Sequence, residues 1–491
     1  MEINTLNDFN PVLSAKKEQT LQFQFNQYLL KKIENGSLPP GTKLPPSRLI
    51  ALDLGISRNT VTHVFDQLKA EGYLTSKKGS GIFINPALPM ITERLLKGAW
   101  AAKTQLPGLS TYGKNLKEAS LESSHLIIDK KNLPFTPGVP DHRAFPEKIW
   151  TRIQRRHTDR NALKGYDNSQ GYLPLRKALT DYLRLSRGVI CNEDQIIITQ
   201  GAQQAITLCA LLLLDQKDVV LMENPGYTNA RHAFLTKQAE LQPLEISTNG
   251  INVESLPDRT NAKLMYTTPT HQYPLGGILS ASQRLKLLDW AATHNVWIIE
   301  DDYDSEFHFH GKPLASIQGM AKRTPVIYIG SFSKTLYPAL RIGYMVVPKE
   351  LTGTFTEAKT HLSGESPLLP QAIVADFISE GHFIRHLRKM RLLYQEKWDH
   401  MQFLVKQNLA SLATPIAESA GMHLALRIDT KSDVHLQTAF AKLGFGSTAL
   451  SSYYFEPPVE KGLVLGFACT HYQERESGIV ALRKLILNKN L

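Results

Sequence analysis

One lysine of the chain lies between two hydroxyl side chains, directly after an apolar run. In VIYIGSFSKTLYPALR, Lys334 follows the run VIYIG, with Ser333 before it and Thr335 after it. A lysine amine at the end of a buried strand can act as a nucleophile toward a carbonyl group. A lysine in a loop is more often a solvated surface residue, so this position alone does not identify a site.

A carboxylate and a phenol follow another apolar run. VWIIEDDYDSEF places Asp301 at the carboxyl end of a predicted strand and Tyr303 two residues later. Open α/β sheets bind ligands at such strand ends. A pyridoxal phosphate site needs an amine for the Schiff base, a carboxylate for the pyridine nitrogen and a phenol near O3′. Lys334, Asp301 and Tyr303 supply these groups, so the sequence predicts that cofactor.

The phosphate end of such a cofactor also has candidate ligands. IIITQGAQQAITL indicates a strand, a glycine turn and a helix, whose first backbone N–H groups would face an anion. An arginine in the same region offers bidentate contacts to phosphate. In ENPGYTNA, the ring of Tyr227 is expected to stack on the cofactor. The predicted phosphate ligands are Gly201, Ala202, Gln203, Ser331, Ser333 and Arg341.

These residues need a sheet to position them. From residue 134 onward, apolar runs alternate with helical patterns, which favours an α/β fold with a mostly parallel sheet and helices on both faces. If these runs form parallel strands, their carboxyl ends lie at one edge of the sheet, next to the residues named above. The predicted strands are 195–199, 219–223, 263–267, 296–300, 326–330 and 342–347.

The first part of the chain predicts three short helices and a hairpin. Ser57 is placed to cap the third helix, and the hairpin tip spans 77–81. One face of that third helix is apolar, with Val61, Val64, Phe65 and Leu68. The opposite face carries Arg58, Asn59, Thr62 and His63. A helix with a polar, basic first turn, supported by two others, is typical of one that enters the DNA major groove.

Composition sets the outer bounds. The 491 residues are too many for one core, and a net charge of +11 permits nucleic-acid binding without establishing it. No apolar run is long enough to span a bilayer, and MEINTLNDFN does not resemble a signal peptide. Three cysteines without CxxC spacing favour the cytoplasm and argue against disulfides or a zinc site. We predict a DNA-binding domain over 14–85, a linker over 86–133 and an α/β domain over 134–491.

The segment PGTKLPPSRLIALDLGISRNTVTHVFDQLKAEGYLTSKKGSGIFI closely resembles the winged helix-turn-helix of the GntR family. The resemblance implies that Arg48 contacts phosphate and base edges. It also implies that the first turn of the recognition helix reads DNA while the wing lies along the minor groove. The implied DNA-binding residues are Arg48, Arg58, Asn59, Thr60, Lys77, Lys78 and Gly79.

From Phe135 onward the chain resembles a fold type I, class I aminotransferase. The matching motifs are FTPGVPDHRAFP, GYDNSQGYLPLR, TQGAQQA, ENPGY, TPTHQYPLG, DDYDSEF and SFSKTLYPALRIGY. Joined to the GntR-like module, they resemble the MocR/PdxR-type subgroup of transcriptional regulators. The resemblance implies that Lys334 binds the cofactor, that Asp301 pairs with the pyridine nitrogen, and that His271 reaches O3′ and the ring. It further implies that Tyr166 reaches the phosphate across a homodimer interface.

The chain departs from the aminotransferase pattern at two places. Val464 aligns with the arginine that usually binds the substrate carboxylate, and Lys334 and Arg341 are seven residues apart, one fewer than in many such enzymes. The possible substitutes for that arginine are Arg143, Arg231 and Arg427, each of which is otherwise a surface residue.

Three functions are open at this point. The first is a DNA-binding dimer that uses pyridoxal phosphate to sense an amino acid, an amine or the cofactor itself, and so regulates transcription from operator DNA. The second is a working aminotransferase with a DNA-binding appendage, which the valine at position 464 argues against. The third is a domain that only dimerises, for which the set Lys334, Asp301 and Tyr303 would be unnecessary. The first is the expectation.

Overall fold

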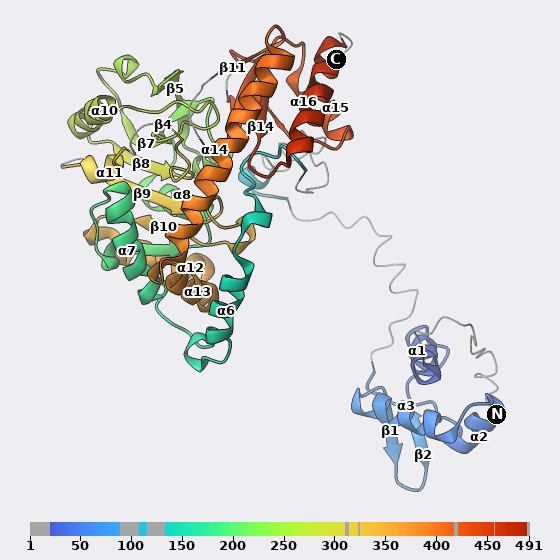
Figure 1. Ribbon diagram of the computed structural model, residues 1–491. Helices are drawn as coiled ribbons and strands as arrows, with labels where there is room; N and C mark the ends of the chain where they lie inside the picture. The colour runs from blue at the N-terminus through green and yellow to red at the C-terminus, as the bar shows by residue number, and fades with distance from the viewer. Residues whose placement is uncertain are drawn as a thin grey trace. The chain divides into compact units, whose positions relative to one another are not determined.

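The computed structural model describes residues 20–88, 108–114, 133–309, 314–322, 325–416, 421–455 and 457–488. The chain divides into two compact units, Met1–Ser110 and Thr111–Leu491, which are described separately (Figure 1). The division falls within the predicted linker, most of which lies outside the described residues. The predicted start of the first domain at residue 14 also lies outside them.

The described residues of the first unit form three helices and a two-stranded antiparallel hairpin (Figure 1). Its elements are α1 (Leu21–Glu34), α2 (Ser47–Asp53), α3 (Arg58–Ala70), β1 (Leu74–Lys77) and β2 (Gly81–Ile84). The side chain of Ser57 accepts a hydrogen bond from the amide of Thr60, so it caps α3 as predicted. The predicted apolar stripe of α3 is buried in one core with residues of α1, α2 and the hairpin. This core fixes the direction of the polar face of α3.

The second unit is built on an eight-stranded sheet in the order β3-β10-β9-β8-β7-β4-β5-β6. Its strands are β3 (Ile196–Thr199), β4 (Val219–Asn224), β5 (Glu240–Ser247), β6 (Gly250–Ile251), β7 (Ala262–Thr267), β8 (Trp297–Asp302), β9 (Val326–Ser331) and β10 (Gly343–Val346). All six predicted strands are present. The sheet is mostly parallel, but β10 is antiparallel to both of its neighbours, and β6 is antiparallel to β5.

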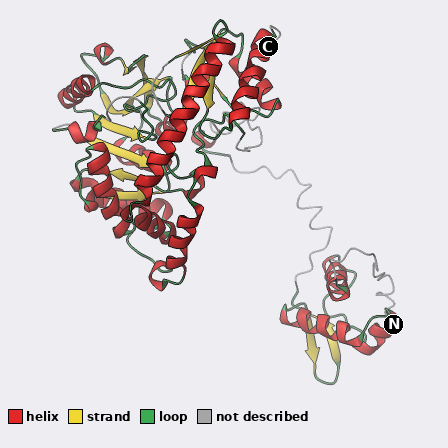
Figure 2. Cartoon of the chain, viewed as in Figure 1, coloured by secondary structure: helices red, strands yellow, loops and turns green. Residues whose placement is uncertain are grey.

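Helices cover both faces of this sheet (Figure 2), as predicted. One face packs against α8, α9 and α12, and the other packs against α10, α11, α7 and α13. The helices are α6 (Glu147–Thr158), α7 (Leu173–Arg187), α8 (Ala202–Leu213), α9 (Thr228–Leu235), α10 (Ala281–His294), α11 (Ile317–Met320), α12 (Thr352–Ser363), α13 (Leu368–Ser379), α14 (His382–Leu409), α15 (Asp433–Lys442) and α16 (Tyr472–Leu487). Short 3-10 turns are η2 (His142–Ala144), η3 (Asn161–Leu163), η4 (Glu193–Gln195), η5 (Val253–Ser255), η6 (Pro338–Leu340), η7 (Lys349–Leu351) and η8 (Leu450–Tyr453).

A second, four-stranded antiparallel sheet lies in the last part of the chain, in the order β11-β12-β14-β13. Its strands are β11 (Ala413–Pro415), β12 (His423–Ile428), β13 (Thr448–Ala449) and β14 (Gly462–Gly466). The long helix α14 contacts α13, which packs on the large sheet, and α16, which lies beside the small sheet (Figure 1). The amide of Gly466 donates a 2.8 Å hydrogen bond to the carbonyl of Phe135, so the chain at Phe135 lies beside β14.

Within the described ranges, no helix combines the length and the apolar character that crossing a bilayer requires. The three cysteines, Cys191, Cys209 and Cys469, are free thiols.

Candidate cofactor site and nucleic-acid interface

Lys334 lies in the turn after β9. Its Nζ donates a 2.9 Å hydrogen bond to the carbonyl of Gly138. Burial lowers the pKa of the Lys334 ammonium below its ordinary value, although Asp304 and Asp301 act in the opposite direction. A lowered pKa increases the share of the neutral, nucleophilic amine. A Cβ at position 138 would lie 2.3 Å from Nζ, so only glycine allows this approach.

Asp301 lies near the carboxyl end of β8, as predicted. Its Oδ2 accepts a 2.6 Å hydrogen bond from the hydroxyl of Tyr266, whereas Oδ1 is buried without a partner in the part of the chain that the structure describes. Burial raises the pKa of Asp301 to about 7, even though the hydrogen bond from Tyr266 lowers it. A buried, unpaired carboxylate oxygen calls for a ligand donor. A protonated pyridine nitrogen is such a donor, so the site fits pyridoxal phosphate.

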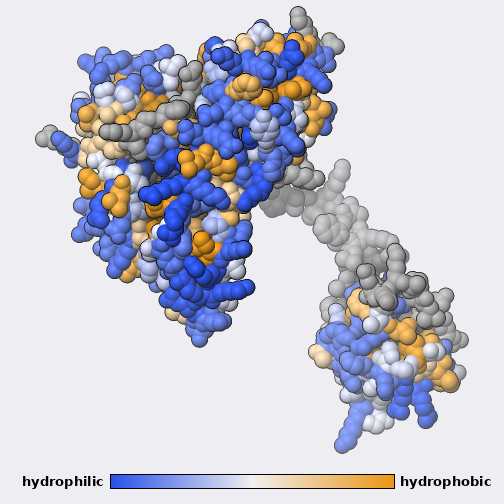
Figure 3. Space-filling view, in the orientation of Figure 1, coloured by the Kyte–Doolittle hydropathy of each residue, from blue (hydrophilic) through white to orange (hydrophobic). Residues whose placement is uncertain are grey.

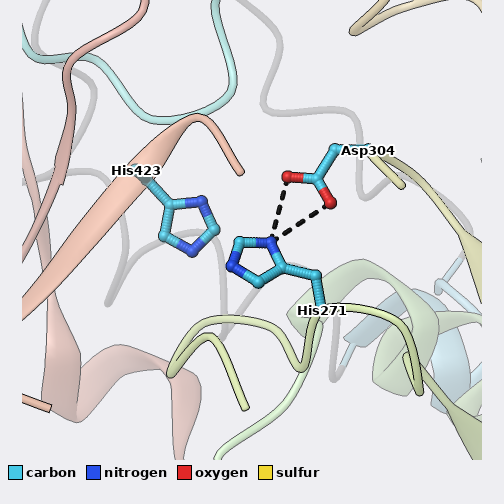
Figure 4. A group of neighbouring side chains, drawn as sticks. All are labelled: His271, Asp304 and His423. Atoms are coloured by element: carbon cyan, nitrogen blue, oxygen red, sulfur yellow. Dashed lines mark hydrogen bonds and ion pairs between the residues drawn. The ribbon is translucent and has the colours of Figure 1, made fainter. Parts of the chain in front are cut away.

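Tyr303 and His271 lie together on the same side of the site. The Tyr303 hydroxyl and His271 Nδ1 are 3.0 Å apart, and their rings stack with centroids 6.0 Å apart. Figure 4 shows that His271 Nδ1 also faces both oxygens of Asp304, at 3.1 and 3.2 Å. His423 lies beside this pair, with its ring centroid 5.2 Å from that of His271.

The predicted phosphate ligands converge at the end of β3. Gly201 precedes α8 with φ +88°, and no side chain caps the helix, so its first amides remain available for an anion. Arg341 Nη2 donates a 2.7 Å hydrogen bond to the carbonyl of Gln200, and Nη1 lies 3.4 Å from where a Cβ of residue 201 would stand. Ser331 pairs with Gly343, which also pairs with Thr199 on β3. Arg341 therefore lies beside the helix start despite the shorter spacing from Lys334.

Three further phosphate-end residues complete this corner. The Oγ of Ser331 donates a 2.9 Å hydrogen bond to the Oγ of Ser333. Gln203 binds the carbonyl of Asn229 through Nε2, while its Oε1 is buried without a partner among the described residues. Ala202 is the first residue of α8.

Tyr227 lies between the two ends of the site. Burial raises the pKa of its phenol, Asp301 adds to the increase, and Arg341 opposes it, so the tyrosine is near both groups. Its ring makes an edge contact with Tyr273, with centroids 5.9 Å apart. The stacking of its ring on the cofactor stays a prediction.

Tyr166 is not brought into this site. It follows the turn η3 and is 94% exposed. A single chain therefore leaves this tyrosine without a role in the cofactor pocket.

The position expected for a carboxylate-binding arginine is apolar. Val464 is fully buried in β14, in a cluster with Ala425, Leu450, Tyr453 and Tyr454. The three arginines considered as substitutes bind acceptors of the chain itself. Arg143 binds Asp141 and the carbonyl of Cys469, Arg231 binds the carbonyl of Tyr454, and Arg427 binds Glu460.

The first unit presents a basic, polar surface. Arg58 and Asn59 are exposed on the first turn of α3, and Thr60 is partly exposed. Lys77, Lys78 and Gly79 are exposed at the hairpin, and hydrophilic side chains cover that end of the unit (Figure 3). Arg48 is exposed on α2. His63, on the same face of α3, lies 3.0 Å from Gln22 of α1, so it also braces the helices.

Several residues of the cofactor site were not found from the sequence. Gly138 and Tyr266 contact predicted residues directly, but a glycine and a strand tyrosine carry no local signal. Asp304 and His423 join His271 only because three distant segments meet. The DDYDSEF motif contained Asp304, so its proximity to Tyr303 was the one available clue.

Two family models match the chain. The model of bacterial regulatory proteins of the gntR family matches residues 22–84. The model of aminotransferase class I and II matches residues 133–444. Each match lies within one of the two structural units.

Similar proteins match along almost the whole chain. The probable rhizopine catabolism regulatory protein MocR of Rhizobium meliloti is 38% identical over 480 residues, 97% of this chain and 96% of that protein. The HTH-type pyridoxine biosynthesis transcriptional regulator PdxR of Corynebacterium glutamicum is 29% identical over 466 residues, 94% of this chain and 95% of that protein.

Solved structures share the fold of the second unit. A kynurenine aminotransferase of Pyrococcus horikoshii has a TM-score of 0.69 at 23% identity, covering 80% of this chain and 98% of that chain. LysN, an α-aminoadipate aminotransferase of Thermus thermophilus, has a TM-score of 0.71 at 24% identity, covering 78% of this chain and 99% of that chain. The second unit therefore has the fold of type I aminotransferases.

Proposed function

Because the chain belongs to the GntR family of bacterial regulatory proteins, in the MocR-type branch that carries an aminotransferase class I and II domain, we propose that it senses a small amino compound. It is a transcriptional regulator with a DNA-binding helix-turn-helix unit, and its second unit binds pyridoxal phosphate. The observation that carries the sensing role is the pairing of a buried amine, Lys334, with the unpartnered Oδ1 of Asp301.

Each end of the site holds a different part of the cofactor. Lys334 would bind its aldehyde carbon, Asp301 its ring nitrogen, and Tyr303 and His271 its O3′ side. Tyr227 would cover the ring. Pyridoxal phosphate supplies an aldehyde that reacts reversibly with amines. The phosphate would lie among Gly201, Ala202, Gln203, Ser331, Ser333 and Arg341.

The protein's own groups define what happens around an incoming amine. Burial lowers the pKa of the Lys334 ammonium, so its Nζ can release a proton more readily than an exposed lysine and take it up again. His271 Nδ1 lies between the Asp304 carboxylate and the Tyr303 hydroxyl, so it can exchange a proton with either group. Burial of these groups keeps bulk water from competing for their hydrogen bonds.

The DNA contacts follow the exposed basic face of the first unit. Arg58, Asn59 and Thr60 would enter the major groove, because they form the first turn of α3 and are exposed or partly exposed. Arg48 and the hairpin residues Lys77, Lys78 and Gly79 would contact the DNA backbone and the minor groove.

We further propose a homodimer in which Tyr166 completes the partner's cofactor site. A tyrosine that is 94% exposed carries a large apolar ring in water, and a second subunit would bury it. The domain bounds 14–85, 86–133 and 134–491 are part of this proposal. A cytoplasmic location would suit three free thiols and a DNA-binding unit.

The alternative, a working aminotransferase with a DNA-binding appendage, has less support. The full-length relatives MocR and PdxR are named as regulators, and Val464 gives a substrate carboxylate no cationic partner. Without that partner the substrate is poorly aligned for proton abstraction. Coupling of about 1–3 kcal/mol between effector and DNA binding would suffice for regulation.

The test uses the full chain and DNA from upstream of its own gene. The wild type should acquire visible absorbance with pyridoxal phosphate, and borohydride should attach the cofactor at residue 334. Lys334→Ala should lose both signals while retaining its fold by circular dichroism. Sustained turnover of an amino donor with a keto acid would contradict the purely regulatory role.

A further inference from the structure

A buried apolar cluster of the last part of the chain, here called the wall, consists of Ala425, Leu450, Tyr453, Tyr454 and Val464. Tyr273 packs against it and also contacts Tyr227 and Tyr303 of the cofactor site. Ala425 on β12 pairs with Val464 on β14. His423 lies two residues before Ala425, so its side chain is on the same face of the sheet as both. His423 in turn contacts the rings of Tyr273 and His271. Residue 464 is therefore a near neighbour of the site's polar side chains.

This wall offers no charge that could stabilise a carboxylate. Burying an unpaired carboxylate is strongly unfavourable, and a guanidinium is its usual partner. Arg187 is bound to Asp302 at 2.6 Å, and Arg341 lies at the phosphate end. Lys397 is bound to Asp141 at 2.7 Å. Arg143, Arg231 and Arg427 likewise bind acceptors of the chain itself.

The polar groups beside the wall are two histidines, an aspartate and two tyrosine hydroxyls. Burial, together with His271 and Lys334, lowers the pKa of His423 to about 3, although the Pro274 carbonyl opposes this, so the imidazole is neutral at physiological pH. Asp304, with a side chain only 1% exposed, faces His271 (Figure 4). The hydroxyls of Tyr273 and Tyr453 are 2.9 Å apart. Such groups exchange hydrogen bonds with hydroxyls and accept them from ammonium groups.

Two imidazole nitrogens remain for a bound molecule. His271 Nδ1 contacts Asp304 and Tyr303, and His423 Nε2 contacts the carbonyl of Pro274 at 3.0 Å. The other nitrogens, His271 Nε2 and His423 Nδ1, have no hydrogen-bond partner in the described part of the chain. His271, Asp304 and His423 are also residue types that bind metals. However, Nε2 of His423 must carry a hydrogen to bind a carbonyl, and His271 Nδ1 is already engaged.

We infer that the effector is a primary amine that bears hydroxyl groups and no carboxylate. Its amino group would react at the cofactor, its hydroxyls would bind the two histidines and the tyrosine pair, and its carbon skeleton would contact the wall. This inference rests on the proposed function and narrows the amino compounds that the site would accept.

The experiment compares matched pairs on the full chain loaded with pyridoxal phosphate. L-serine is compared with serinol, in which a hydroxymethyl group replaces the carboxylate, and L-alanine with L-alaninol. The readouts are the change in cofactor absorbance and the change in affinity for the upstream DNA. Each amino alcohol should act at a concentration at least about tenfold lower than its amino acid, because one lost charged hydrogen bond has that effect.

A second arm changes the wall. Val464→Arg should reverse the preference within each pair, and Val464→Leu, which keeps the wall apolar, should not. Cofactor absorbance reports whether each variant is folded. If Val464→Arg does not fold, the comparison of amino alcohols with amino acids on the wild type tests the inference by itself.

The outcomes separate the two proposals. A chain that takes up no pyridoxal phosphate contradicts the proposed function itself. A chain that takes it up, yet responds equally to both members of each pair or to neither, overturns only this inference.

Discussion

The hydroxyl of Tyr266 donates to Asp301 Oδ2 and leaves Oδ1 of the same carboxylate buried and unpaired among the described residues. One oxygen is thus held in place by the protein while the other is directed to a ligand. This division of roles makes Asp301 both a cofactor contact and a cost to the cofactor-free protein. Two of the predictions below follow from it.

Asp301→Asn should weaken pyridoxal phosphate binding by about 10- to 100-fold. The amide cannot form the charge-assisted hydrogen bond to the ring nitrogen, which is worth about 1.5–3 kcal/mol. The measurement is a titration followed by visible absorbance. Asp181→Asn, at an exposed carboxylate on α7, is the control and should bind as the wild type does.

The stability of the cofactor-free protein should depend on pH through Asp301. Burial raises its pKa from 3.8 to about 7, so between these values the folded state keeps a proton that the unfolded state has released. The carboxyl's contribution to the free energy of unfolding therefore falls as pH rises through that window. Urea unfolding at pH about 5 and about 7 should show a smaller decrease for Asp301→Asn. Equal decreases in both proteins would refute this assignment.

Gly138→Ala should impair cofactor binding, because the new Cβ would lie 2.3 Å from Lys334 Nζ and displace the amine. The residue also has φ +74°, which disfavours alanine. Gly353→Ala is the matched control, since a Cβ there, on α12, meets nothing within 4 Å. The visible absorbance after cofactor addition should be reduced only in Gly138→Ala. Normal absorbance in that variant would contradict the close approach.

Substitutions of Arg58 and Lys78 should affect DNA binding in different ways. Arg58→Ala should weaken binding to the upstream DNA by about 1–3 kcal/mol and relax its sequence preference, whereas Lys78→Ala should reduce the salt dependence by about one phosphate contact. Fluorescence anisotropy across a range of salt concentrations distinguishes these effects. Lys69→Ala, at the end of α3 and paired with Asp66, should change neither. The assignment fails if all three variants bind alike.

Tyr166→Ala and Lys334→Ala should complement each other. If Tyr166 serves the site of the partner subunit, each variant alone binds the cofactor poorly. Subunit exchange between the two would create one site with both residues intact. Absorbance should then reappear on mixing. No recovery, despite mixed dimers seen by native mass spectrometry, would place Tyr166 outside the partner's site.

The sequence predicted those parts of the fold that local patterns specify. The strands β3, β4, β7, β8, β9 and β10 are continuous apolar runs because both of their faces are buried. In contrast, β5 lies near the edge of the sheet with only Leu244 buried, and its polar residues interrupt any apolar run. The insertion of the antiparallel β10 between β3 and β9 depends on tertiary packing, which no local spacing specifies.

The same distinction applies to the site. Lys334, Asp301 and Tyr227 follow strands or short turns, so the carboxyl edge of the sheet gathers them predictably. His423 comes from the small sheet, and its position beside His271 depends on how two sheets pack. Tyr166 also illustrates the limit, because its expected role requires a second chain.

The amide of Gly466 on β14 donates a hydrogen bond to the carbonyl of Phe135. Three residues farther on, the amine of Lys334 donates one to the carbonyl of Gly138. Residues 135–138 are thus held by two hydrogen bonds to the rest of the second unit. A ligand that displaced β14, or that bound the amine of Lys334, would alter one of these two hydrogen bonds directly. Residues 135–138 would then be the first part of the chain leading toward the DNA-binding unit to register that a ligand is bound.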